Sequence, residues 1–152
     1  MKRALLQAGV LTGIVDGLWA VSLTLYYGRT VERLWQGVAA VPFGQRMFEI
    51  GAAGVAVGLA IHFCVAFAWS AVLLLLLQRS ERLRSANPVA VGAVFGPLIW
   101  IVMSLAVIPL FTRQATVLTL RWWVQLAGHA VFVGQPMAWT LKSARFSNVE
   151  PS

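Results

Sequence analysis

Four long apolar runs divide this chain, and each is long enough to cross a lipid bilayer as one helix. They cover about residues 4–27, 50–78, 88–111 and 122–142, and a spanning helix needs about 20 predominantly apolar residues. Only 11% of the 152 residues are charged, whereas soluble domains carry roughly 25%. The sequence therefore predicts an all-α integral membrane protein, a single four-helix bundle.

The first run begins like a secretory signal, with Lys2 and Arg3 ahead of an apolar stretch. Its length, the presence of Asp16 in its middle and the lack of a clear small-x-small cleavage site instead predict an uncleaved helix. The final residues, 147–152, are expected to be a disordered tail.

Residues 28–49 separate the first two runs and are too polar to span. Aromatic side chains beside arginines predict an interfacial helix, interrupted at Pro42 and Gly44. An ordinary ordered loop is the alternative interpretation.

The net charge of +7 comes from basic residues that stand mainly at the ends of the apolar runs. Such residues anchor helices to anionic headgroups, so lipid, and not nucleic acid, is the expected partner. The side that holds both termini carries Lys2, Arg3, Arg79, Arg82, Arg84, Lys142 and Arg145. The opposite side carries Arg29, Arg33, Arg46, Arg113 and Arg121. Because basic residues in short loops favour the cytoplasm, a multi-pass protein of the bacterial inner membrane with both termini cytoplasmic is expected.

Small residues recur at helical spacing in three of the runs. These are Gly9, Gly13 and Gly17, then Gly54 and Gly58, then Gly92 and Gly96. In lipid, small residues let helix backbones approach closely, so these faces predict tight contacts, either within the chain or with other copies or membrane subunits. Pro97 removes a backbone donor inside the third run and is expected to kink it.

Asp16 and His62 are the ionisable residues expected deepest in the bilayer. Asp16 lies roughly 16 Å along the first helix at 1.5 Å per residue, close to the midplane of a core about 30 Å thick. His62 occupies a similar depth in the second helix, aligned with Gly58 and Gly54. The two are predicted to meet, either as a proton-exchanging pair or as a polar contact that only locks the two helices together.

A polar stripe of Gln125, His129 and Gln135 is expected on the fourth helix. His62 and His129 together raise the alternative of a bis-histidine haem b site. Counted from the helix ends, however, the two imidazoles fall about 8 Å out of level. Interhelical hydrogen bonding is therefore the favoured role for His129, and neither a metal nor a cofactor is expected.

Patterns typical of enzymes are missing from the sequence. It has no paired carboxylates, nucleophile elbow, phosphate-binding glycine loop or H-E-x-x-H motif. The single cysteine, Cys64, follows His62 by two residues, a spacing that separates them on a helix. We therefore expect a protein without catalytic residues.

Three short stretches resemble the YagU-like group of uncharacterised bacterial inner-membrane proteins. They are His62-Phe63, the run from Gly92 to Pro109-Leu110, and Gly128-His129, within roughly the C-terminal 90 residues. The resemblance implies a location in the bacterial cytoplasmic membrane and repeated use of the positions of His62 and His129, but no known reaction. The mixed segment 28–49 differs from the larger intervening region of that group.

Three functions follow from these features, in order of expectation. The first is a non-enzymatic oligomeric or accessory subunit of an inner-membrane complex, based on the glycine faces and the absence of catalytic motifs. The second is a proton-linked transporter or channel that uses Asp16 and His62, with Pro97 breaking a helix beside them. The third is an electron-transfer protein that binds haem or a metal through its two histidines.

Overall fold

The computed structural model describes residues 2–146, with side chains described for residues 2–143. The predicted disordered tail, 147–152, lies outside the described residues. Within the described part the chain forms helices and connecting loops, without strands. In chain order the elements are α1 (Lys2–Tyr26), α2 (Val31–Phe43), η1 (Gln45–Phe48), α3 (Ala52–Arg79), α4 (Glu81–Ser85), α5 (Pro88–Val102), η2 (Met103–Val107), α6 (Ile108–Thr112), α7 (Leu120–Gly128), η3 (His129–Gly134) and α8 (Gln135–Phe146).

Three helices have the length and apolar composition of a membrane span: α1, α3 and the continuous segment Pro88–Thr112. Their outward faces are apolar as well, with Leu18 63% and Val94 71% exposed. Helices that are apolar all round are typical of proteins surrounded by lipid. The last helical segment, which runs from α7 through η3 to α8, is more polar and is not one of the three helices that have this length and apolar composition. The all-helical prediction and three of the apolar spans are thus present in the structure.

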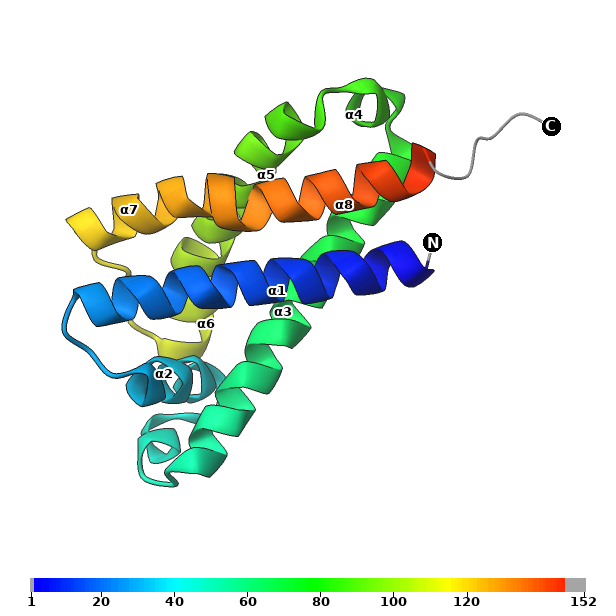
Figure 1. The fold of residues 1–152 in the computed structure, drawn as a ribbon. Coiled ribbons are helices and arrows are strands. Elements are labelled where there is room, and N and C mark those ends of the chain that lie inside the picture. Colours follow the sequence, from blue (N-terminus) through cyan, green and yellow to red (C-terminus); the bar gives the residue numbers. More distant parts are fainter. Residues whose placement is uncertain (1, 147–152) are drawn as a thin grey trace.

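The long helices pack in an oblique arrangement (Figure 1). The α7–η3–α8 segment runs beside α1 and also packs against α5, whereas α3 crosses α1 at a steep angle. The start of α1, α4 and the last described turn of α8 lie at one end of the molecule, and α2 and the loop between α6 and α7 lie at the other (Figure 1). Both described ends of the chain are therefore at the same end of the helices.

The close-packed core occupies the half of the molecule nearest the described ends of the chain. Ala8, Leu73, Leu77, Met137 and Leu141 are at most 1% exposed there, and they bring α1, α3 and α8 into one cluster. Packing of this density fixes the relative positions of the three helices. The other half of the molecule, toward α2, contains the cavity described below.

Glycines make the closest helix contacts, and they do so within the chain. A methyl group at Gly96 would overlap the carbonyl oxygen of His129, and one at Gly134 would overlap the carbonyl oxygen of Gly92. At Gly58 it would overlap the carbonyl oxygen of Trp35 on α2. The remaining predicted glycines also contact other helices of the chain. Gly9 and Gly13 lie under phenylalanine rings of α3. Gly17 lies beside His62, and Gly54 lies against the backbone of η1. Small residues are thus used where helices of the same chain cross.

The two π-helical segments, η2 and η3, each lie just before a proline. Pro109 follows η2 and Pro136 follows η3. A proline offers no amide hydrogen to the carbonyl four residues earlier and its ring crowds that carbonyl. In both cases that carbonyl, of Leu105 or Phe132, lies inside the π segment. Pro97 lies within α5, which continues to Val102, and the kink expected there stays a prediction.

The mixed segment 28–49 forms a helix, α2, followed by the short turn η1. Thr30 caps α2 by accepting a hydrogen bond from the amide of Arg33 (3.3 Å), as is common at helix starts. The helix passes through Pro42 and ends at Gly44, whose φ of 80° favours glycine. Close approach of α2 to Gly54 and Gly58 holds it against α3, where it covers one side of the cavity.

Candidate functional site

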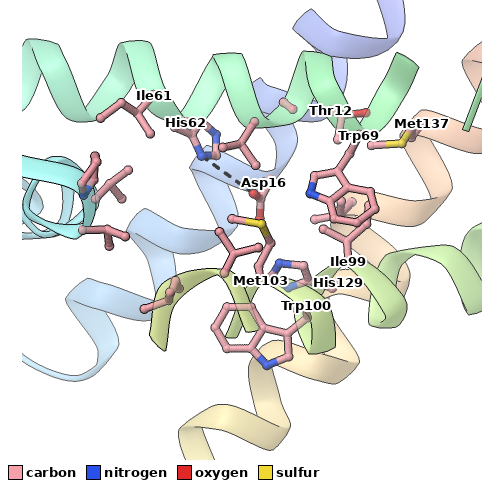
Figure 2. Close-up of a pocket in the computed structure, with 18 of the residues that line it drawn as sticks. Thr12, Asp16, Ile61, His62, Trp69, Ile99, Trp100, Met103, His129 and Met137 are labelled. Carbon is pink, nitrogen blue, oxygen red and sulfur yellow. Dashed lines mark ion pairs between the residues drawn. The ribbon is translucent and has the colours of Figure 1, made fainter. Parts of the chain in front are cut away.

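A cavity of about 360 Å³ lies among α1, α2, α3, α5, η2, α6, η3 and α8. Its walls are mainly apolar and aromatic, and Trp69, Ile99, Trp100 and Met103 contribute large side chains to it. Figure 2 shows these side chains around a central space between α3 and α5. Val38, Val41 and Pro42 of α2 also line the cavity.

Three titratable side chains reach this cavity from three different elements. Asp16 comes from α1, His62 from α3 and His129 from η3, and among the described lining residues they are the only acidic or basic side chains. The Asp16 carboxylate lies between the two imidazoles (Figure 2) and interacts electrostatically with both. The structure therefore brings together the predicted pair, Asp16 and His62, and adds His129 to it.

His62 is oriented by the backbone of α1. Its Nε2 lies 2.8 Å from the carbonyl oxygen of Gly13, and a carbonyl oxygen can only accept a hydrogen bond. Nε2 therefore carries the proton, and Nδ1 turns toward Asp16, 3.9 Å from Oδ2. Close approach at Gly17, where a methyl group would lie 3.5 Å from His62 Nε2, keeps the ring near α1.

His129 is oriented by its own helix. Its Nδ1 lies 2.8 Å from the carbonyl oxygen of Gln125, one turn earlier, so by the same reasoning Nδ1 carries the proton. The ring packs against the indole of Trp100, with 4.8 Å between centroids, and the residue is only 8% exposed. This geometry leaves Nε2 of His129 as its unprotonated nitrogen.

Asp16 is held less tightly than the two histidines. In the described part of the chain no donor is recorded within hydrogen-bond distance of its carboxylate. The nearest ionic partner, Nδ1 of His62, lies 3.9 Å from Oδ2, which is too far for a hydrogen bond. A second polar group nearby is also unsatisfied: the hydroxyl of Thr12, one turn earlier on α1, is buried without a partner and Thr12 lines the cavity. Buried polar atoms without partners are uncommon in folded proteins.

The predicted polar stripe on the fourth helix separates into three different contacts. Gln125 accepts a hydrogen bond from Trp19 Nε1 at 2.9 Å, and Gln135 donates to the carbonyl oxygen of Val89 at 3.0 Å. Only His129 of the three lines the cavity. Gln125 and Gln135 thus join α7 and α8 to neighbouring helices.

No metal cluster follows from these residues. In the described range 2–146 no three His, Cys, Asp or Glu side chains are arranged to hold a metal ion. Each imidazole donates one N–H to a backbone carbonyl, and the other nitrogen of His62 faces Asp16, so the bis-histidine haem alternative stays a prediction. Cys64, which is exposed, does not line the cavity.

Several lining residues could not be assigned from the sequence. Thr12, Trp69 and Trp100 resemble ordinary apolar or small helix residues until their helices are placed. One signal was available, since Thr12 precedes Asp16 by four residues and therefore shares its helix face.

Comparisons with protein-family models, curated proteins and solved structures give no match to this chain. The resemblance to the YagU-like group stays a prediction. The site holds one carboxylate and two imidazoles inside a mainly apolar cavity, and groups of these kinds can exchange a proton.

Proposed function

We propose that this chain is a four-helix protein of the bacterial inner membrane that works as a proton-linked carrier of a small ligand. The observation that carries the proposal is the convergence of Asp16, His62 and His129 on one cavity within the apolar part of the molecule. In this proposal Asp16 binds and releases the proton, the two imidazoles share it, and the cavity holds the ligand.

The cost of an ionisable group in a membrane supports a functional role for Asp16. Placing such a group at the centre of a spanning helix costs about 2.5–3.5 kcal/mol on insertion scales. A contact that served only to lock two helices would recover part of that cost through a close hydrogen bond. Asp16 instead stands 3.9 Å from His62 beside an open cavity, an arrangement that suits reversible binding.

The charge distribution supports the proposed topology. Lys142 is 5% exposed, and its ammonium donates to the carbonyl oxygens of Leu83 (2.9 Å), Arg84 (3.0 Å) and Ala86. This ties the arginine-rich turn at α4 to α8, at the end of the molecule that also holds Lys2. A compact basic cluster of this kind is typical of the cytoplasmic side.

The glycine faces support self-association less than the sequence suggested. Seven predicted glycines approach other parts of the same chain, so the need for close packing is met without a second copy. A role as a non-enzymatic accessory subunit remains a prediction that the absence of catalytic motifs favours. The lipid-facing surface is available to such partners.

Proton movement through reconstituted protein tests the proposal. Liposomes containing the protein and a trapped pH-sensitive dye are given a potassium diffusion potential, which drives protons across the membrane. We expect the wild-type protein to speed the pH change, and we expect Asp16→Asn to abolish that increase because the amide does not titrate. Glu49→Gln makes the same chemical change at an exposed position outside the cavity and serves as the matched control. Equal rates for Asp16→Asn and wild-type protein would contradict the proposal.

A further inference from the structure

The polar atoms that face the cavity from the three titratable residues are all hydrogen-bond acceptors when the imidazoles are neutral. The proton of His62 is directed at the carbonyl oxygen of Gly13, and that of His129 at the carbonyl oxygen of Gln125. What remains is Nδ1 of His62, Nε2 of His129 and the oxygens of Asp16. A ligand that complements this set must supply donors.

The charge of the cavity also limits the class of ligand that it can bind. With neutral imidazoles, Asp16 gives the cavity one negative charge, and none of the described cationic side chains of Lys or Arg lines it. Burying an unpaired carboxylate is costly, and a bound cation offsets that cost. An anionic ligand would place two like charges in an apolar space.

The distance between Asp16 and His62 fits a single donor group. Nδ1 of His62 and Oδ2 of Asp16 are 3.9 Å apart. A ligand nitrogen placed about 2.9 Å from both atoms would see them at an angle of about 85°. Two N–H bonds of one ammonium group can serve both acceptors with modest bending. A hydroxyl has only one hydrogen and would leave one acceptor without a donor.

The walls select the rest of the ligand. Trp69 and Trp100 present indole rings, and Phe111 presents a phenyl ring, so an apolar or aromatic body would be buried beside the ammonium. Aromatic faces also attract cations directly. The volume of about 360 Å³ lies at the low end of the range of about 300–1,000 Å³ found for small-molecule sites.

We propose that the cavity binds a small apolar amine in its protonated form, with the ammonium group on Asp16 and His62 and the hydrocarbon body against the tryptophans. The inference rests on the proposed carrier function and names its ligand class. Binding a proton at Asp16 removes the charge that holds the ammonium, so the amine and the proton occupy this carboxylate alternately. The amine and the proton therefore compete for one carboxylate, and bound amine should slow the proton movement that depends on Asp16.

Equilibrium binding to the intact protein tests the inference. The protein is placed in phosphatidylcholine nanodiscs, whose net charge is zero, and titrated calorimetrically with three probes of one shape: naphthylmethylamine, naphthylmethanol and naphthoate. We expect the amine to bind about 10-fold or more tightly than the alcohol, as a hydrogen bond to a charged group implies. We expect no saturable binding of naphthoate.

Variants separate binding at the site from partition into lipid. Asp16→Asn should weaken the amine about 10-fold or more while changing alcohol binding little, and Glu49→Gln should leave all three probes unchanged. Wild-type selectivity alone keeps the inference testable if Asp16→Asn does not fold. Naphthoate or naphthylmethanol binding as tightly as the amine would overturn the inference, as would full amine affinity in a folded Asp16→Asn protein.

The binding and liposome experiments together distinguish failure of the proposed ligand class from failure of the proposed carrier function. Selective amine binding without proton movement in liposomes would refute the carrier and leave the ligand class standing. Proton movement that depends on Asp16, together with preference for the anion, would refute the ligand class alone.

Discussion

Replacing Gly96 by alanine tests the crossing of α5 and η3, which also positions His129. A Cβ at Gly96 would lie 2.6 Å from the carbonyl carbon of His129 and 2.9 Å from the amide nitrogen of Gly134, whereas ordinary contact begins at 3.4 Å. Both neighbours are backbone and cannot rotate away, so the helices must separate by about 1 Å. A gap of about 0.5–1 Å forfeits a quarter to a half of each dispersion contact, and overpacking typically costs about 1–3 kcal/mol.

Reversible unfolding in mixed detergent micelles, followed by circular dichroism, measures this cost. We expect Gly96→Ala to lower the free energy of unfolding by about 1–3 kcal/mol. Gly37→Ala is the matched control, because its Cβ would meet only Phe48, at an ordinary 3.9 Å, and alanine is the better helix former by about 1 kcal/mol. Equal stability of the two variants would refute the argument that backbone contact at Gly96 sets the helix spacing.

Three further substitutions test other contacts by the same titration. Lys142→Met removes the donor shared by three carbonyls at the end of α4. We expect the free energy of unfolding to fall by about 1–3 kcal/mol and amide exchange at residues 80–87 to become faster. Unchanged exchange at these residues would count against this role of Lys142. Ser104→Ala leaves the buried Nε1–H of Trp122 without its 3.0 Å acceptor, with a similar expected loss, and wild-type stability would contradict it. Thr12→Val removes a buried hydroxyl that has no partner, so equal or higher stability is expected, and a marked loss would show that the hydroxyl is satisfied.

The apolar runs could be predicted because lipid imposes a length and a composition on each span. Runs at 4–27, 50–78 and 88–111 correspond closely to Lys2–Tyr26, Ala52–Arg79 and Pro88–Thr112. The fourth run is less clear because His129 and its neighbouring glutamines lower its apolar character. The start of the third span could also be predicted from single residues, because proline favours the first position of a helix. In the structure α5 begins at Pro88 and is capped by Asn87.

The arrangement of the site could be predicted only in part. Counting residues along each helix placed Asp16 and His62 at one depth, and their side chains do meet. The same counting left His129 about 8 Å out of level with His62, although both line one cavity. Residue counts convert to depth only for parallel, regular helices, whereas α3 crosses α1 steeply (Figure 1) and His129 opens a π segment. Crossing angles and π segments depend on contacts between distant parts of the chain.

Glycine spacing shows the same limit. The sequence identifies faces that permit close approach, but the partner of each face depends on the tertiary structure. Gly134, which completes the crossing with Gly92 and Gly96, belongs to no regular spacing and was not predicted. Gly128 lies under the indole of Trp19, a contact that its position beside His129 in the sequence does not predict.

Nitrogen-15 chemical shifts of the two histidine rings, measured in nanodiscs, test the central claim most directly. If Asp16, His62 and His129 share one cavity, Asp16→Asn must change the ring-nitrogen shifts of both imidazoles, because it removes the carboxylate that lies 3.9 Å from His62 and lines the same cavity as His129, while Glu49→Gln changes neither. Ring-nitrogen shifts of His62 and His129 that are unaffected by Asp16→Asn would contradict the account.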